Sequence, residues 1–294
     1  MSNELIQRYR DWGEHIKPSF TPPQAIRINT LKTQKDTVKN LKEEGFILKK
    51  HSSVQQGYTY TSEKSISSTP EYLSGRIYRQ GIASQLPAEI LNPSEKSTIL
   101  DMCAAPGSKT TQLAAYTKNK ANIISLEKNN NKINTLRSNL DRCGVTNVVL
   151  HRKDARYADD LQQTYDYVLL DPPCSGNYAQ DEDFFSKRTL EGVKTRIKPQ
   201  RKLLEAAYYV LKPGGVLVYS TCSLEPEENE HQIEWFTNTY KDMKIRPIHK
   251  DIGSSGYTDI EGKQMKKSLS KTKRLWPHKD NTEGFYIAKL QKQK

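Results

Sequence analysis

The sequence predicts an α/β fold built on a mostly parallel sheet with helices on both faces, preceded by a small α+β unit. From about residue 78, strand-like and helix-like segments alternate along the chain, which is the pattern of a parallel sheet with crossover helices. The strand-like segments are short apolar runs such as ILDM and YVLL, typical of strands buried on both faces. The 294 residues suffice for one large domain or two modest ones with a real core.

The first part of the chain, residues 1–77, has the pattern of a small α+β domain. Helical periodicity, a glycine stop and short alternating strands are its signals. The expected order is helix 3–16, strand 25–32, helix 33–45, strand 46–51, strand 58–63 and a polar connector at 64–75.

Residues 78–294 carry the alternating pattern and form the second expected domain. Each apolar run is followed by a segment of helical character. The expected strands are 97–104, 121–129, 147–154, 165–173, 216–223 and 284–290. The expected helices are 108–118, 132–144, most of 188–215, and 226–240.

Charge and cysteine content narrow the class of protein. The chain has 46 Lys and Arg against 34 Asp and Glu, a net charge of +12. This favours a polyanionic partner, nucleic acid or anionic membrane, with a lysine-rich solvated surface as the alternative. The four cysteines show no CxxC pair and no zinc-type spacing with histidine, so we expect no metal site and reduced thiols in the cytoplasm. No apolar run is long enough to cross a bilayer, and the first 20 residues lack the apolar core of a signal peptide.

Polar and thiol side chains follow the ends of the predicted strands. In an open parallel sheet, ligands bind beyond the carboxyl ends of the strands, so we expect these side chains to gather on one edge. Core packing alone does not account for so many of them at one edge. The residues concerned are Asp101, Cys103, Glu127, Asp154, Asp171, Cys174 and Cys222.

The segment 103–109, CAAPGSK, suits a small-molecule site. Its small residues let the backbone approach a ligand, and it precedes a helix N-terminus whose free N–H groups suit an anion. It matches neither of the glycine-rich phosphate loops. Glu127 ends the second strand, where an acid can hold ribose hydroxyls, and Asp154 ends the third. An acid for ribose without a phosphate loop suggests a nucleoside such as S-adenosylmethionine, while a helix cap is the alternative role for each acid.

Four sequence blocks are more specific together than any one alone: DMCAAPGSKTTQLA, DPPCSG, YSTCSLEPEENE and RLWPHKDNTEGFYIAKL. In this order they resemble the RNA cytosine-C5 methyltransferases of the Sun (Fmu) family, over roughly residues 25–294. The resemblance implies a Rossmann-like class I methyltransferase core that uses S-adenosylmethionine. The family often has Gly where Ser108 stands and Asp where Glu127 stands. Carried over by motif, the cofactor contacts are Cys103, Ala104, Ala105, Pro106, Gly107, Ser108, Lys109, Glu127, Lys132, Asp154 and Asp171.

The resemblance also implies covalent catalysis by a thiol. C5 of cytosine is a poor nucleophile until a thiolate adds at C6, and the reaction then needs proton transfers and expulsion of the thiol. In this family the nucleophile is the cysteine of the Thr-Cys-Ser motif, here Cys222. The cysteine of the Pro-Cys motif, here Cys174, is implicated in product release. Asp171 is expected at N3 of the base, and Lys109 is expected to favour the thiolate with its positive charge.

Plainer interpretations of some residues stay open. A buried reduced cysteine is commonly a small hydrophobic residue, which suits Cys143, and a disulfide between Cys174 and Cys222 is conceivable. The acids of the segment 225–230, EPEENE, favour capping and the helix dipole as their role. Bracing of the cysteine loop is the alternative role for Asn229.

Two segments dense in Lys and Arg, residues 194–202 and 263–279, predict contacts with RNA phosphates. We expect tRNA or rRNA as the substrate, with tRNA preferred because the chain is compact, an N-terminal domain that clamps the RNA, and a monomer. One alternative is an amino-group methyltransferase, which Cys174 argues against because those enzymes carry an aromatic residue there. The other is a non-catalytic, cofactor-binding RNA assembly factor.

Overall fold

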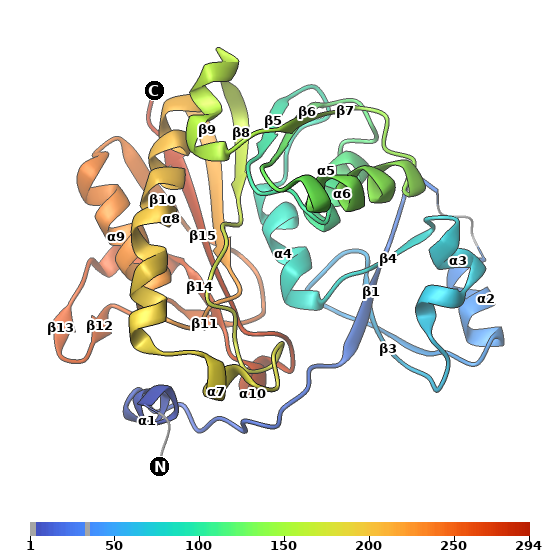
Figure 1. Ribbon diagram of the computed structural model, residues 1–294, viewed down its shortest axis with the longest axis horizontal. Coiled ribbons are helices and arrows are strands. Elements are labelled where there is room, and N and C mark those ends of the chain that lie inside the picture. Colours follow the sequence, from blue (N-terminus) through green and yellow to red (C-terminus); the bar gives the residue numbers. More distant parts are fainter. Residues whose placement is uncertain (1–3, 33–35) are drawn as a thin grey trace.

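A mixed β-sheet organises the larger part of the protein in the computed structural model, which describes residues 4–32 and 36–294 (Figure 1). Its strand order is β11-β14-β15-β9-β8-β5-β6-β7, and β10 pairs with β15. The neighbours from β9 to β7 pair in parallel, and the other pairs are antiparallel. The bounds are β5 Thr98–Asp101, β6 Asn122–Glu127, β7 Val148–Arg152, β8 Tyr165–Leu170, β9 Leu211–Thr221, β10 Met243–Arg246, β11 Ser254–Ser255, β14 Lys273–Leu275 and β15 Phe285–Lys292.

Helices cover both faces of this sheet (Figure 1). Alternate strand residues face opposite layers: Leu100 of β5 belongs to the core on the side of α8 and α9, while its neighbour Ile99 belongs to the core on the side of α4 and α5. The parallel strands β5, β6 and β8 are therefore buried on two faces, as their apolar runs predicted, whereas the edge strand β7 is only partly buried. The bounds are α4 Ile82–Leu91, α5 Ser108–Tyr116, α6 Asn130–Arg142, α8 Leu190–Val210 and α9 Glu230–Thr239.

The closing strand β15 runs antiparallel to β9, with Tyr286 opposite Thr221. Because the two strands run in opposite directions, the first residues of β15 lie at the edge where β9 ends. This orientation brings residues 283–285 to the same edge as the ends of the parallel strands.

A second sheet, with all pairs antiparallel and the order β2-β3-β1-β4, forms the small unit. It packs around its own apolar cluster, which includes Ile26, Leu41 and Phe46. The buried Arg27 of β1 joins this unit to the larger one: its guanidinium donates to Gln80 (2.8 Å) and to Thr111 of α5 (2.7 Å). The bounds are β1 Gln24–Ile28, β2 Ile47–Lys50, β3 Gly57–Thr61, β4 Ile77–Arg79, α2 Thr37–Glu43 and α3 Pro70–Leu73.

Helix α1 (Glu4–Asp11) lies against the larger unit and away from the small sheet (Figure 1). Leu5 and Tyr9 are buried in a cluster with Phe184, Leu224 and Trp276. The division of the chain at residue 77 remains a prediction, and the small sheet continues through β4 to Arg79 because β4 pairs with β1.

Some expectations about individual elements were wrong or incomplete. Residues 211–215, expected at the end of a helix, belong to β9. The connector at 64–75 contains a 3₁₀ turn (Ile66–Ser68) and α3. Strands β10, β11 and β14 were not anticipated because they are too short to show a period of two. The start of the expected helix 33–45 falls on residues 33–35, outside the described residues. Within the described ranges, no helix is long and apolar enough to cross a membrane.

Candidate active site

Two adjacent cavities lie beyond the carboxyl ends of the parallel strands. Cavity A has a volume of about 430 Å³ and is lined by residues that follow β5, β6, β7 and β8 and by the first half of α8. Cavity B has a volume of about 310 Å³ and is lined by the 103–109 loop, by β4 and the residues after it, and by Asp171. Cys103 lines both cavities and forms part of the wall between them.

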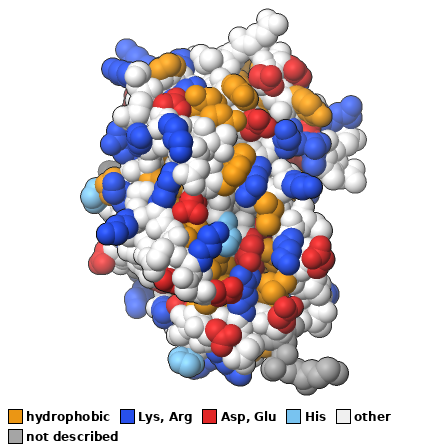
Figure 2. Space-filling view, turned by 90° about the vertical axis from the view of Figure 1, so that its left-hand side faces the viewer, with side chains coloured by type: hydrophobic (Ala, Val, Ile, Leu, Met, Phe, Trp, Pro, Cys, Tyr) orange, Lys and Arg blue, Asp and Glu red, His pale blue; other side chains and the backbone are white. Residues whose placement is uncertain are grey.

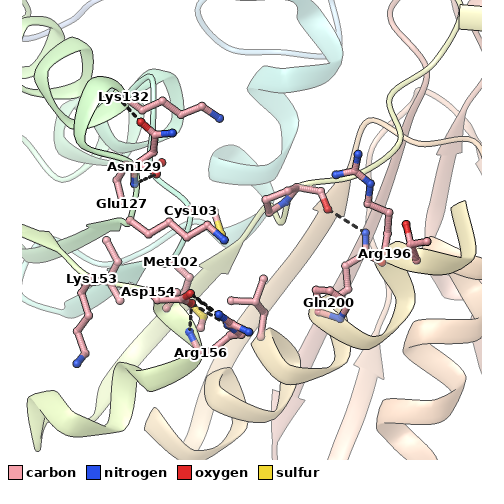
Figure 3. A pocket seen from close by; sticks show the side chains of 17 residues that line it. Met102, Cys103, Glu127, Asn129, Lys132, Lys153, Asp154, Arg156, Arg196 and Gln200 are labelled. Carbon is pink, nitrogen blue, oxygen red and sulfur yellow. Dashed lines mark hydrogen bonds and ion pairs between the residues drawn. The ribbon is translucent and has the colours of Figure 1, made fainter. Parts of the chain in front are cut away.

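Cavity A contains the acids that were predicted to hold a nucleoside (Figure 3). Glu127 at the end of β6 accepts a hydrogen bond from the backbone N–H of Asn129 (2.7 Å), and Asn129, not Glu127, caps α6. Asp154 does cap a helix, because it accepts from the N–H of Arg156 (3.0 Å), and it also binds the Arg156 guanidinium (2.7 Å). That guanidinium lowers the pKa of Asp154 below its ordinary value. Lys132 also lines this cavity.

The far wall of cavity A was not predicted from the sequence. Arg196 and Gln200 of α8 lie across the cavity from Lys153 and Asp154 (Figure 3), and Leu203 of the same helix also lines the cavity. Arg196 and Gln200 lie in the segment 194–202, which the sequence indicated only as a basic patch. No local signal distinguishes a helix that covers a cavity from a helix that lies on a surface.

The 103–109 loop lines cavity B through Cys103, Ala104, Ala105, Pro106, Ser108 and Lys109. Gly107 ends the loop with a φ of +104°, a left-handed conformation that favours glycine. A Cβ at this position would also lie 2.8 Å from the Leu136 side chain. The local backbone and packing therefore favour glycine at position 107, whether or not a ligand approaches the backbone there.

Lys109 and Asp171 form an ion pair in the wall of cavity B. Lys109 Nζ lies 2.6 Å from Asp171 Oδ2, and Ser220 donates to Asp171 Oδ1 at 2.7 Å. Burial alone would lower the pKa of Lys109, but the Asp171 carboxylate outweighs burial and raises it. Lys109 is thus a permanent positive charge at this edge of the sheet.

The two predicted catalytic thiols meet at this edge. Cys174 Sγ and Cys222 Sγ lie 3.0 Å apart, and neither cysteine is in a disulfide. The hydrogen bond to Cys222, followed by burial, raises the pKa of Cys174 well above its ordinary value. Cys222 is among the groups that raise the pKa of Lys109.

Cys103 and Cys143 differ from this pair. Burial, with the charges of Asp101 and Asp171, raises the pKa of Cys103 well above its ordinary value, so this thiol is a neutral part of the wall between the cavities. Cys143 is fully buried, in agreement with its interpretation as a small core residue.

Several side chains at this edge were missed. Glu283, just before β15, lines cavity B and accepts from the N–H of Ala83 (3.3 Å) at the start of α4. Gln80 and Gln180 line the same cavity. A Cβ at Gly81 would overlap the Glu283 carboxylate. These residues come from loops, and only the antiparallel direction of β15 brings Glu283 to this edge.

The acids Glu227 and Glu228 lie in the first turn of a 3₁₀ helix and Glu230 in the first turn of α9, where the predicted dipole role places them, but no described side chain caps either helix. Glu225, Glu228 and Glu230 are fully buried, and each side chain has a specific partner elsewhere. Asn229 braces the cysteine loop: it accepts from the Thr221 hydroxyl (2.6 Å) and donates to the Ser223 carbonyl (2.9 Å). The bracing alternative is therefore correct for Asn229.

The basic segment 263–279 divides into exposed and buried residues. Lys263, Lys267 and Lys271 are exposed, on the side of α9 where Lys and Arg side chains are scattered among acids (Figure 2). Arg274, in contrast, is fully buried and pairs with Glu230. The prediction of a phosphate contact is wrong for Arg274, because its side chain does not reach the surface.

The chain is similar to known RNA-modifying enzymes over most of its length. Residues 88–291 match the family model described as 16S rRNA methyltransferase RsmB/F. The chain is 36% identical to a tRNA (cytosine(49)-C(5))-methyltransferase of Pyrococcus abyssi, over 99% of this chain and 96% of that protein. It is 33% identical to the ribosomal RNA small subunit methyltransferase F of Vibrio parahaemolyticus, over 92% of this chain and 57% of that protein. It spans 36% of the length of a mouse 28S rRNA (cytosine-C(5))-methyltransferase, with 34% identity.

Solved structures of methyltransferases also superpose on this chain over nearly its whole length. A methyltransferase homologue from Pyrococcus horikoshii superposes with a TM-score of 0.90 at 37% identity, over 99% of this chain and 95% of that one. NSun6 from Pyrococcus horikoshii with SFG superposes with a TM-score of 0.86 at 27% identity, over 100% of this chain and 98% of that one. The fold is therefore the predicted Rossmann-like class I methyltransferase fold. The chain belongs to the RsmB/F family of RNA cytosine-C5 methyltransferases, which confirms the family that its four sequence blocks predicted.

Proposed function

We propose that the protein methylates C5 of a cytosine in tRNA with S-adenosylmethionine as donor, acting as a monomer in the reducing cytoplasm. The single observation that carries the proposal is the pair of free thiols 3.0 Å apart, at the sheet edge that also holds Lys109 and Asp171. Thiol addition to C6 needs one nucleophilic cysteine. An amino-group methyltransferase or a non-catalytic RNA assembly factor needs neither thiol.

Cavity A suits S-adenosylmethionine in its volume of about 430 Å³ and in its lining residues. It offers two acids, Glu127 and Asp154, for the nucleoside, and apolar side chains such as Met102, Leu126 and Leu203 for the adenine ring. When bound, the cofactor supplies a methyl group on a positively charged sulfur. Lys132 and Cys103 also line cavity A. Apart from Gly107, the other predicted cofactor contacts in the 103–109 loop, and Asp171, line cavity B, so we propose that the cofactor reaches them only where the two cavities meet at Cys103.

Cavity B is the proposed pocket for the flipped cytosine. Lys109, Asp171, Gln180 and Glu283 offer charged and amide groups to the polar edge of a base. Phe285, whose ring centre lies 5.8 Å from Lys109 Nζ, offers an aromatic surface beside it. We assign Asp171 to N3 of the base, where a proton held between the two neutralises the ring after thiol addition.

We assign different catalytic roles to the two thiols. We assign the bond to C6 to Cys222, the cysteine of the Thr-Cys-Ser block, and Lys109, paired with Asp171, supplies a positive charge at the same edge of the sheet. The hydrogen bond to Cys222, followed by burial and the charges of Cys222 and Glu228, raises the pKa of Cys174. Once C5 carries the methyl group, a base removes the C5 proton and the C6–S bond breaks to return the Cys222 thiolate. We assign Cys174 to this release step.

Transfer RNA is the proposed substrate for two reasons. This chain spans nearly the whole length of an archaeal tRNA enzyme, but much smaller shares of rRNA-modifying relatives. The small N-terminal sheet lines the proposed base pocket through Tyr78 and Arg79 of β4, which supports a role for the N-terminal domain, residues 1–77, in holding the RNA.

Denaturing gels with single cysteine variants test the chemistry. With RNA containing unmodified cytosine, we expect Cys174→Ala to accumulate a protein–RNA adduct that survives denaturant, because addition and methylation proceed but release stalls. Cys222→Ala should bind RNA and cofactor yet form no adduct and no product. An adduct in Cys222→Ala but not in Cys174→Ala would reverse the assignment. Full methylation by both variants would refute thiol catalysis.

The substrate is tested by methyl transfer to unmodified tRNA and rRNA transcripts, followed by mapping of 5-methylcytosine. We expect a mapped site in tRNA. Efficient methylation confined to rRNA would refute the tRNA assignment and leave the cysteine chemistry unaffected.

A further inference from the structure

A buried carboxylate connects the two cysteine turns. Ser175 follows Cys174, Ser223 follows Cys222, and the two serine hydroxyls lie 3.0 Å apart. The backbone N–H of Ser175 lies 3.1 and 3.2 Å from the two carboxylate oxygens of Glu228, and its hydroxyl donates to Oε2. One carboxylate therefore holds the first turn directly and the second through the paired serines.

Helix α8 and strand β9 hold this carboxylate in place. Gln200 donates to Glu228 Oε1 (2.9 Å) and to the carbonyl of Pro173 (3.1 Å), which immediately precedes Cys174. The hydroxyl of Tyr219 donates to the backbone carbonyl of Glu228 (2.7 Å). Glu228 has no solvent exposure, so its geometry is set entirely by these contacts.

The charge of Glu228 is unusual for a buried carboxylate. Among the described residues, its hydrogen-bond donors are the neutral groups of Ser175, Ser223 and Gln200, and burial raises its pKa. A buried acid without a cationic partner is costly. Its neighbour Glu227 follows the usual rule and pairs with Arg8 at 2.6 Å. The position of Glu228 therefore requires a reason other than stability.

We propose that Glu228 is a positioning residue that locks the Cys174 and Cys222 turns together and so sets the distance between the two sulfurs. This inference rests on the proposed function for its catalytic consequence, but not for its structural one. A nucleophile displaced by about 1 Å from its attack position loses about 100-fold in rate. Weakening the hydrogen bonds between Glu228 and the two cysteine turns should slow the chemical steps and leave the binding of RNA and cofactor unchanged.

Glu228→Gln is the informative change, since it keeps the shape of the side chain. The amide nitrogen of the new side chain cannot accept a hydrogen bond, so the hydrogen bond from the Ser175 hydroxyl is lost. Ser223→Ala is a second variant, which removes the link to the second turn and also the acceptor of the Glu225 backbone N–H (3.1 Å). Glu227→Gln is the matched control, because Glu227 is adjacent in sequence and contacts Arg8 instead of either turn.

The first measurement needs neither RNA nor cofactor. Diamide oxidises two nearby thiols to a disulfide by taking up their two electrons and two protons, and peptide mass spectrometry identifies the Cys174–Cys222 bond. We expect the parent and Glu227→Gln to form this bond at the same rate, and Glu228→Gln and Ser223→Ala to form it at least five-fold more slowly. If Glu228→Gln does not fold, Ser223→Ala decides.

The second measurement is steady-state methylation of RNA. We expect kcat of Glu228→Gln to fall 10- to 100-fold while KM for RNA and for S-adenosylmethionine stays within two-fold. An unchanged oxidation rate in Glu228→Gln and Ser223→Ala overturns the proposal. Slower oxidation with an unchanged kcat also overturns it. If the parent itself methylates no cytosine, the proposed function fails, and the oxidation rates still decide whether Glu228 sets the sulfur distance.

Discussion

The buried ion pair between Arg274 and Glu230 allows a quantitative test of the fold. Both side chains have 0% exposure, and two nitrogens of Arg274 lie 2.6 Å from the two carboxylate oxygens. A third nitrogen donates to the Leu224 carbonyl at 2.8 Å. Arg274→Met keeps an apolar stem of similar length but leaves the Glu230 carboxylate buried without its counter-charge.

The expected loss is about 3–5 kcal/mol of unfolding free energy, the usual effect of breaking one side of a buried ion pair. For a chain of this length, this corresponds to a decrease in Tm of about 5–8 °C. The double variant Arg274→Met/Glu230→Leu should lose less than Arg274→Met alone, because it leaves no unpaired charge. In the double variant the backbone N–H of Tyr257 still loses its acceptor, the Glu230 carboxylate (3.0 Å), which costs about 1 kcal/mol.

The assay is chemical unfolding and thermal melting of the parent, both variants and Lys271→Met. Lys271 lies in the same basic segment but is exposed, so its replacement should change stability by no more than about 0.5 kcal/mol. If Arg274→Met melts like the parent and instead weakens the salt dependence of RNA binding, Arg274 is a surface contact and the reasoning fails.

Three further predictions concern cofactor, RNA and pH. Calorimetry should show weaker binding of S-adenosylmethionine to Glu127→Ala and to Asp154→Ala; unchanged affinity in both variants would contradict the role of cavity A. Neutralising Lys263, Lys267 and Lys271 together should reduce the slope of log affinity against log salt by about 0.7–0.9 for each RNA phosphate that is no longer neutralised, and an identical slope would make this segment a plain solvated surface. Burial raises the pKa of Glu225 from its ordinary 4.5 to about 7. The folded state thus binds its proton more tightly than the unfolded chain, and this contribution to stability is complete below pH 4.5 and is lost as the pH rises through 7. The stability of Glu225→Gln should therefore decline less than that of the parent over this interval, and parallel curves would contradict the raised pKa.

Much of the fold follows from local patterns. The short apolar runs that became β5, β6 and β8 predicted a sheet buried on two faces, and the helices between them predicted parallel crossovers. Strands β10, β11 and β14 escaped prediction because two to four residues carry no measurable period. The antiparallel direction of β15 also has no local signal, since it depends on which neighbour the strand pairs with.

The sequence by itself determined the family of this protein and predicted the edge of the sheet at which its site residues gather. Residues at the ends of parallel strands share one edge by topology, so Asp171, Cys174 and Cys222 could be placed together before any contact was known. The Pro-Cys and Thr-Cys-Ser blocks identified the two thiols, and the four blocks in order identified the family.

Only the tertiary structure decided which charged residues serve the surface and which serve the interior. Arg274 lies in a lysine-rich segment and Glu228 in an acidic one, and both sequences are typical of solvated surface. In the folded chain Arg274 neutralises Glu230, and Glu228 holds the two cysteine turns. The physical reason is that burial of a charge depends on partners distant in the chain, here 44 residues away for Arg274 and 53 for Glu228, and no local pattern records such partners.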